Sequence, residues 1–544
     1  MERGQEFLLP PNMIDWLPED HLVWFVIDTV AALDTSALHS RAARRRDGKS
    51  RTSMAGRASY DPDMLLTLLI YAYACGERSS RRIERLCATD VAFRVICAAD
   101  APDHSVLARF RQVHGETFTQ LFAQVLRLCR QEGLARLGTV AIDGTKIAAN
   151  ASPLLNRTEQ WLRAEAENLD RDSTTRADSA DTDGERELAR LVLAEADAVD
   201  AAEDDQFGTG HDDELPARLR ARAGRRERIR AALERIAAEK ATEAAEKAAS
   251  DASRAERDAV ALAHAERALR QEIAARHAAR DAWEQAWEHA MTNPGAALPK
   301  GRAPVAPEQS GSVRRARARL DKARQRVENP DTAPRPGRRR GGRLDHPDNG
   351  DPKPEPKANL TDADSTIMPS RRGWVQGYNA QFAITADQII LATAISTNPA
   401  DVVSYQHMVD QVQRGIADLD ATDELGTLLF DAGYASEDTL TAPGPDRLIA
   451  LGKTHSVRAA ARDNPTSGDP PPRATAREAM DHRLRTPEGA TLYARRGATV
   501  EPGIGNFKKI LDRFSQRGLT AVTNEVHLAA TAFNLLKIHR AAHS

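Results

Sequence analysis

The chain has 544 residues and a formal net charge of −3, from 76 Lys and Arg against 79 Asp and Glu. At roughly 150 residues per domain, this length predicts two to four folded units. The nearly equal numbers of basic and acidic residues do not by themselves indicate a nucleic-acid partner. Any nucleic-acid-binding surface must therefore come from a local cluster of basic residues. The four cysteines form no C-x-x-C pair, which excludes a zinc ribbon and a disulfide framework. The apolar run at 22–33 is too short to span a bilayer, so we expect a cytoplasmic protein without membrane contact, associated with the nucleoid when bound to DNA.

Residues 1–135 predict an all-helical N-terminal domain. Asp61 followed by Pro62 is a typical helix start, and helical spacing of apolar residues continues to Tyr73. Arg109 and Arg111 are expected on an outer face, which favours a helix-turn-helix-like DNA-binding domain; a helical bundle with solvated arginines fits equally well. Further short helices are expected at 80–88, 90–96 and 105–114.

A basic run at 41–57 contains seven Lys and Arg residues and one acid, Asp47. Such a run favours contact with phosphates, and a flexible charged loop would have the same composition.

Two short apolar segments each lead to an aspartate followed by a glycine turn. The run at 139–147 contains Asp143 and Gly144, and the run at 428–434 contains Asp431 and Gly433. This pattern predicts buried strands that present a carboxylate at their tips. Between them, a hairpin is expected from strands at 373–384 and 388–395, followed by a helix at 404–419.

Residues 155–357 differ in composition from both flanks. Ala, Arg and Glu dominate 217–290, which predicts long solvated helices or a helical hairpin. A tract rich in Pro, Gly and Arg follows, with five arginines at 335–343, and we expect no regular structure there. The whole stretch is interpreted as a charged helical insertion, either a projection that contacts DNA or a second protomer, or a passive spacer.

The order of these elements predicts an α/β catalytic domain with an RNase H-like fold, a mixed sheet with helices, split into 136–154 and 358–544. Asp143, Asp431 and Glu501, the last at an expected helix start, would meet at one edge of the sheet. Two divalent ions roughly 3.5–4 Å apart stabilise the entering and leaving oxygens of phosphodiester transfer. Mg²⁺ prefers hard oxygen ligands, so three carboxylates suit it better than His or Cys.

Four motifs in this order resemble bacterial insertion-sequence DDE transposases, specifically the group numbered eleven-eighty-two. They are Ile-Asp-Gly-Thr-Lys at 142–146, Gly-Tyr-Asn-Ala-Gln at 377–381, Asp-Ala-Gly-Tyr at 431–434, and a Tyr-Arg-Glu-Lys signature near the C-terminus. The resemblance covers about residues 5–155 and 358–538. It implies a transposase that binds terminal inverted repeats, cleaves DNA strands and transfers them to target DNA, as a homodimer or larger assembly on DNA.

The resemblance also implies site residues. Asp143, Asp431 and Glu501 form the implied triad for Mg²⁺, with Mn²⁺ as a substitute. In the signature, Tyr493, Arg496 and Lys508 accompany Glu501. Four residues separate Arg496 from Glu501 where the pattern usually has three, so either Arg495 or Arg496 takes the arginine role.

Proline at 502 predicts that Glu501 caps a new helix, where the positive helix end favours the ionised carboxylate. On that helix Lys509, Arg513 and Arg517 are expected to share a basic face. The predicted DNA-binding residues are Tyr493, Arg496, Lys508, Lys509, Arg513 and Arg517.

Five polar residues before and on the expected hairpin are weaker candidates. Tyr378, Asn379 and Gln381 would lie on a strand beside Asp143, where they orient the carboxylate or fill the sheet. Asp362 and Asp364 either reach the site or cap a turn.

Two other functions fit the same residues. One is a metal-dependent nuclease of the same fold that cuts DNA without joining it. The other is a non-catalytic DNA-binding or scaffold protein in which the alanine-rich helices mediate assembly.

Overall fold

The computed structural model describes residues 12–39, 60–175, 222–293, 297–329, 355–370, 373–419, 421, 424–472 and 474–543. The chain forms two compact units, residues 1–235 with 356–544, and residues 236–355. The basic run at 41–57 and the Arg-rich tract at 335–343 lie outside the described residues. Within the described ranges, no helix is both long and apolar enough to cross a membrane.

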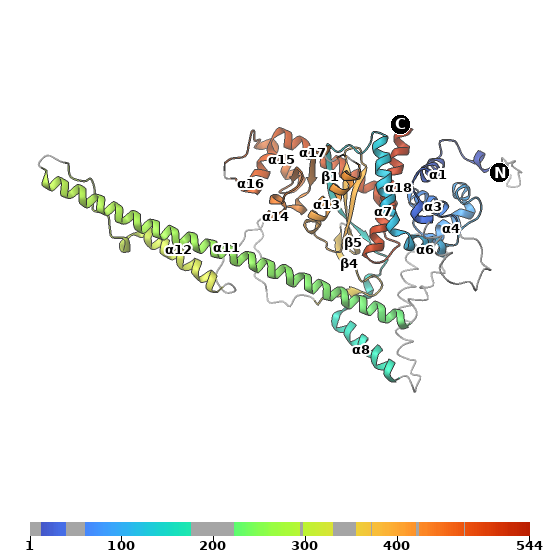
Figure 1. The fold of residues 1–544 in the computed structure, drawn as a ribbon, viewed down its shortest axis with the longest axis horizontal. Coiled ribbons are helices and arrows are strands. Elements are labelled where there is room, and N and C mark those ends of the chain that lie inside the picture. Colours follow the sequence, from blue (N-terminus) through green and yellow to red (C-terminus); the bar gives the residue numbers. More distant parts are fainter. Residues whose placement is uncertain are drawn as a thin grey trace. The chain divides into compact units, whose positions relative to one another are not determined.

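The N-terminal part of the first unit is helical, as predicted (Figure 1). Asp61 caps α3 by accepting the Asp63 backbone N–H, and Pro62 occupies the first turn. Arg111 is not on an outer face: it is buried, and its guanidinium donates to the Tyr73 hydroxyl at 3.1 Å. The elements are η1 (Met13–Trp16), α1 (Leu22–Ala32), α3 (Pro62–Ala74), α4 (Ser80–Thr89), α5 (Val91–Ile96), α6 (His104–Val113) and α7 (Gly115–Gln131).

A mixed sheet follows, centred on β1 (Thr139–Ala148). β1 pairs antiparallel with β5 (Gly373–Thr385) on one side and parallel with β7 (Thr427–Phe430) on the other, and β7 pairs parallel with β8 (Arg447–Ile449). The far edge of β5 pairs antiparallel with β6 (Ile390–Ser396) and β4 (Thr366–Ser370). The expected hairpin is therefore confirmed as β5 and β6. The strand order is β4-β5-β1-β7-β8, and β6 also pairs with β5.

Asp143 does not lie at the tip of its strand, contrary to the sequence-based expectation. β1 continues to Ala148 because β5 remains paired with it over that length. The pairing of β1 with β7, however, ends at Ala141 and Leu429. Asp143 therefore lies in mid-strand, just beyond the point where β7 ends and Asp431 begins the next turn.

The helix that carries Glu501 also differs from the expectation. α17 (Pro487–Ile510) begins fifteen residues earlier than predicted, with Thr486 as its cap, and it passes through Pro502 without a break. Buried residues recur at helical spacing on both sides of the proline, among them Val500, Gly503 and Phe507, so packing on the sheet sustains the helix. Glu501 is therefore inside a helix and does not cap one.

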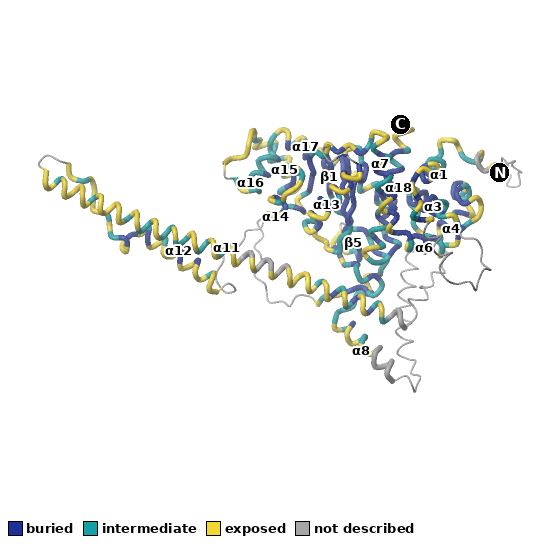
Figure 2. The backbone as a smooth tube through the Cα atoms, viewed as in Figure 1, coloured by how far each residue is buried: buried dark blue, intermediate teal, exposed yellow. Residues whose placement is uncertain are grey.

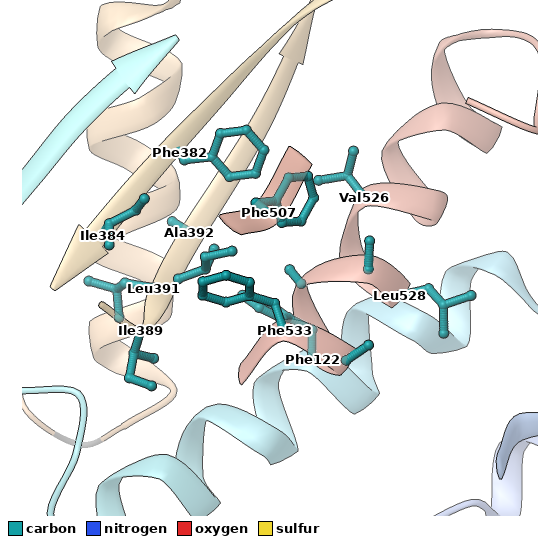
Figure 3. Close-up of a cluster of buried hydrophobic side chains, with 14 of the residues drawn as sticks. Phe122, Phe382, Ile384, Ile389, Leu391, Ala392, Phe507, Val526, Leu528 and Phe533 are labelled. Carbon is teal, nitrogen blue, oxygen red and sulfur yellow. The ribbon is translucent and has the colours of Figure 1, made fainter. Parts of the chain in front are cut away.

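Aromatic side chains join the sheet to the helices on one of its faces. Phe382 of β5 contacts Phe507 of α17, with ring centroids 4.6 Å apart, and Phe507 contacts Phe533 at 6.2 Å. Figure 3 shows these rings together with Phe122 of α7. The remaining helices are η4 (Asp401–Ser404), α13 (Tyr405–Ala417), η6 (Ala432–Tyr434), α14 (Glu437–Thr441), α15 (Thr454–Asp463), α16 (Ala476–Arg485) and α18 (Leu519–Ala542).

The stretch predicted as an insertion begins and ends at neighbouring points of the first unit. β2 (Asn156–Thr158) pairs antiparallel with β3 (Lys357–Asn359), so residues 158 and 357 lie side by side. η2 (Pro153–Leu155) comes just before β2. Between β2 and β3, the described residues form α8 (Glu159–Thr175), α11 (Arg222–Thr292), η3 (Pro307–Gln309) and α12 (Gly311–Glu328).

The second unit consists of most of α11 with α12 packed along it. The guanidinium of Arg276 donates to Ser312 at 3.1 Å, and Val313, Leu320 and Ala323 are buried. Figure 2 shows that most of both helices is exposed or half-buried, which agrees with the long solvated helices predicted at 217–290.

Candidate active site

Asp143 and Asp431 come from neighbouring parallel strands, and short local contacts fix both carboxylates. Oδ1 of Asp143 accepts the backbone N–H of Gly144 at 2.8 Å. Oδ1 of Asp431 accepts the N–H of Gly433, also at 2.8 Å, which caps η6 directly after β7. In each aspartate the Oδ2 atom is thus left for a partner elsewhere in the chain.

That partner is Arg496 of α17. Its Nη2 lies 2.9 Å from Oδ2 of Asp143 and 3.9 Å from Oδ2 of Asp431, and the side chain is 8 % exposed. Arg495 is exposed on the same helix. Of the two arginines that the signature left open, Arg496 is therefore the one beside the carboxylates.

The two aspartates are less acidic than ordinary carboxyl groups. Burial raises the pKa of Asp143 to about 6; the Arg496 charge opposes this rise, and the neighbouring charge of Asp431 adds to it. Burial also raises the pKa of Asp431, again opposed by Arg496. The two carboxylates are partly buried and repel each other, so binding of an additional cation between them is favourable.

A third carboxylate, Asp401, lies beside them and was missed in the sequence. It begins η4, directly after the turn that follows β6. Its Oδ1 accepts hydrogen bonds from Gln381 Nε2 at 2.8 Å, Asn379 Nδ2 at 2.9 Å and Lys146 Nζ at 3.3 Å. The sequence signal that could have identified Asp401 is an aspartate at a helix start that follows another strand of the same sheet.

The polar residues of β5 therefore divide between the two faces of the strand. Asn379 and Gln381 do lie beside β1, but they bind Asp401 and not Asp143. Tyr378 points to the other face, where its hydroxyl donates to Oδ1 of Asp362 at 2.6 Å.

Asp362 and Asp364 hold the start of α18. Asp362 accepts the N–H of Gly518 at 3.1 Å, and Asp364 accepts the N–H of Leu519 at 2.8 Å. These contacts match the capping alternative raised for the pair.

Glu501 is on α17 but is exposed, and its carboxylate makes no hydrogen bond or ion pair with any described residue. Glu501 lies five positions after Arg496, which turns its side chain roughly 140° around the helix from that of Arg496. Its Oε1 lies 3.7 Å from where a Cβ of Gly497 would stand. The structure thus brings two of the three predicted triad members together and leaves Glu501 on the same helix without contact to them.

The predicted DNA-binding residues lie in different surroundings. Tyr493 is buried, and burial together with the charges of Asp431 and Asp143 raises its pKa. Lys508 donates to the carbonyl of Lys146 at 3.2 Å, while Lys509 is exposed beside Asn506.

Arg513 and Arg517 do not share a helical face with Lys509, because α17 ends at Ile510. Instead, Arg513 donates to the carbonyl of Ala149 at 3.3 Å, and Arg517 to that of Asn150 at 2.8 Å. Both arginines therefore hold the chain just after β1.

Two regions of the chain match family models. A transposase domain (DUF772) matches residues 11–113, which contain the helices from η1 to α6, and a transposase DDE domain matches residues 469–539, which contain α16, α17 and most of α18. No curated protein and no solved structure matches the chain. With both a transposase domain and a DDE domain in one chain, the matches support an insertion-sequence DNA transposase.

Proposed function

We propose that this chain is a DDE transposase that binds the terminal inverted repeats of its own element, cuts the DNA at the element's ends and joins those ends to target DNA. The observation that carries the proposal is the meeting of Asp143 and Asp431 on adjacent strands around the guanidinium of Arg496. The two transposase matches lie on either side of this sheet in the sequence and support the same function.

The strand order supports an RNase H-like catalytic domain. In this sheet β5 is antiparallel to β1, β4 and β6, and β1, β7 and β8 run parallel. In this proposal residues 1–135 form the DNA-binding domain, 136–154 and 358–544 the catalytic domain, and 155–357 an insertion between its first strands.

The donor set fits a divalent metal. DDE transposase domains are typically metal-dependent, and hard carboxylate oxygens suit Mg²⁺, with Mn²⁺ as a substitute. Asp143 and Asp431 would hold the metal, and Glu501, whose side chain the structure leaves apart from them on α17, is the proposed third ligand. Bound divalent ions supply the Lewis acidity for in-line attack on a phosphodiester.

The chain's own residues then position DNA. Tyr493, Arg496 and Lys508 lie along the buried or half-buried side of α17, and exposed Lys509 lies near its end. We assign phosphate contacts to these residues and to Arg513 and Arg517, whose guanidinium groups already hold the chain after β1. A homodimer or larger assembly in the bacterial cytoplasm would hold two element ends together.

Strand cleavage tests the proposal. With DNA that carries the element's end and Mg²⁺, Asp143→Asn and Glu501→Gln should each reduce cleavage by at least a hundredfold, with DNA binding retained. Asp418→Asn and Glu488→Gln make the same charge changes at exposed positions, the second on α17 itself, and should cleave normally. Unreduced cleavage by either active-site variant would contradict the triad.

A strand-transfer assay separates the transposase from a nuclease of the same fold. The unaltered protein should join a pre-cut element end to plasmid DNA. Cutting without joining would favour the nuclease, and binding without cutting in either Mg²⁺ or Mn²⁺ would favour a non-catalytic protein.

A further inference from the structure

Asp401 lies against β1 and against the turn after β7, and it has no role in the triad. We propose that Asp401 is a positioning residue, which fixes the spacing of the Asp143 and Asp431 carboxylates so that together they bind a divalent metal. This inference rests on the proposed function, because it concerns the metal site of the same reaction.

The first contact is with β1, next to Asp143. A Cβ on Gly144 would lie 2.5 Å from Oδ1 of Asp401 and 2.3 Å from Nε2 of Gln381, so only glycine allows this approach. Lys146, two residues further along the strand, donates to the same Oδ1 at 3.3 Å and to the Pro399 carbonyl at 2.8 Å. Asp401 is thereby tied to the segment that sets the direction of the Asp143 side chain.

The second contact is with the turn that holds Asp431. A Cβ on Gly433 would lie 3.2 Å from Oδ2 of Asp401 and 3.0 Å from Oδ1 of Asp431, so both carboxylates lie against the same glycine. The N–H of Gly433 is also the donor that orients Asp431. A shift of Asp401 would therefore move the turn on which the Asp431 geometry depends.

Neighbouring side chains in turn hold Asp401 rigidly. Asn379 and Gln381 are fully buried on β5 and donate to its Oδ1, and the hydroxyl of Tyr434, just after Gly433, donates to the Oε1 of Gln381. The network runs from β5 through Asp401 to β1 and to the η6 turn. Hydrogen-bonded partners behind metal ligands commonly change metal affinity 10–100-fold when they are removed.

The test is Mn²⁺ binding by the full-length protein without DNA, measured by titration calorimetry. Asp401→Asn should weaken Mn²⁺ binding about tenfold, while thermal unfolding in EDTA shows that the variant is folded. Asp418→Asn, at the other end of the helical segment that Asp401 begins, removes one exposed carboxylate charge and should bind Mn²⁺ like the unaltered protein. Asn379→Leu keeps the Asp401 charge, removes one donor to it and should also weaken binding, by about threefold.

The outcomes are separable. If Asp143→Asn abolishes Mn²⁺ binding while Asp401→Asn and Asn379→Leu bind normally, the positioning role is wrong and the proposed function stands. If the unaltered protein binds no Mn²⁺, both fail. A lower unfolding temperature with unchanged Mn²⁺ affinity would make Asp401 a structural residue only. If Asp401→Asn does not fold, Asn379→Leu decides by the same titration.

Discussion

Nη2 of Arg496 lies 2.9 Å from Oδ2 of Asp143, in a site where the arginine side chain is only 8 % exposed. The same nitrogen is 3.9 Å from Oδ2 of Asp431. A single guanidinium therefore offsets the repulsion between two carboxylates whose pKa values burial raises.

Replacing this arginine should expose that repulsion. Arg496→Met is expected to lower the free energy of unfolding in EDTA by about 3 kcal/mol, because it leaves two neighbouring carboxylates without their buried cation. Mn²⁺ should then restore more stability to the variant than it adds to the unaltered protein. Urea unfolding with and without Mn²⁺ measures both effects. Arg495→Met, at the exposed neighbouring position, is the control, and equal stability of the two variants would contradict the assignment.

Gly144 should tolerate no side chain. A Cβ there would lie within 2.5 Å of Asp401 and Gln381, so Gly144→Ala must displace the network and should cost about 1–3 kcal/mol of stability. Gly138 directly precedes the same strand, and no atom lies within 4 Å of the position of a Cβ there. Gly138→Ala should therefore change stability little. Chemical denaturation of both variants tests this difference, and a Gly144→Ala protein as stable as Gly138→Ala would refute the close approach.

Glu525 links the two regions that match transposase families. It is 2 % exposed; Oε1 accepts the Tyr73 hydroxyl at 2.7 Å, and Oε2 accepts the N–H groups of Ser515 and Gln516 at 3.0 and 2.9 Å. Glu525→Gln replaces an acceptor oxygen with a donor and should cost about 2 kcal/mol, measured by urea unfolding. Exposed Glu488→Gln should change stability by less than about 0.5 kcal/mol. A loss no greater than that of this control would show that the network is not needed for stability.

His527 should make the fold sensitive to acid. Burial lowers its pKa to about 4; its ring stacks on Phe122, and Nδ1 lies 2.9 Å from Thr119 Oγ1. The unfolded histidine takes up a proton near pH 6.5, as model peptides do, whereas the folded one takes it up only near pH 4. The stability that neutral His527 contributes is thus fully present above about pH 6.5 and is lost as the pH falls toward 4.

The unfolding temperature between about pH 7 and 4 measures this loss. His527→Gln should give a flatter curve than the unaltered protein, because the side chain no longer titrates. Exposed His543→Gln should keep the original slope. Identical slopes for all three proteins would exclude His527 as the source.

The sequence alone determined the elements that local chemistry controls. Asp61 and Pro62 mark the start of α3, and β-branched apolar runs mark β1 and β7, because capping and side-chain period act over a few residues. The order of these elements was enough to place Asp143 and Asp431 on neighbouring strands. The helix through Pro502 was missed because packing of Val500 and Phe507 on the sheet outweighs the local preference of proline.

Only the tertiary structure decided which side chains meet at the site. It selected Arg496 over Arg495, since burial depends on which side of α17 faces the sheet. It added Asp401, which lies 258 positions after Asp143 in the sequence and reaches it only because β5 pairs with both β1 and β6. The roles of Gly144 and Gly433 also became visible only in the tertiary structure, because the absence of a Cβ matters only where another part of the chain comes close. Such contacts arise between segments distant in sequence, and no local pattern records them.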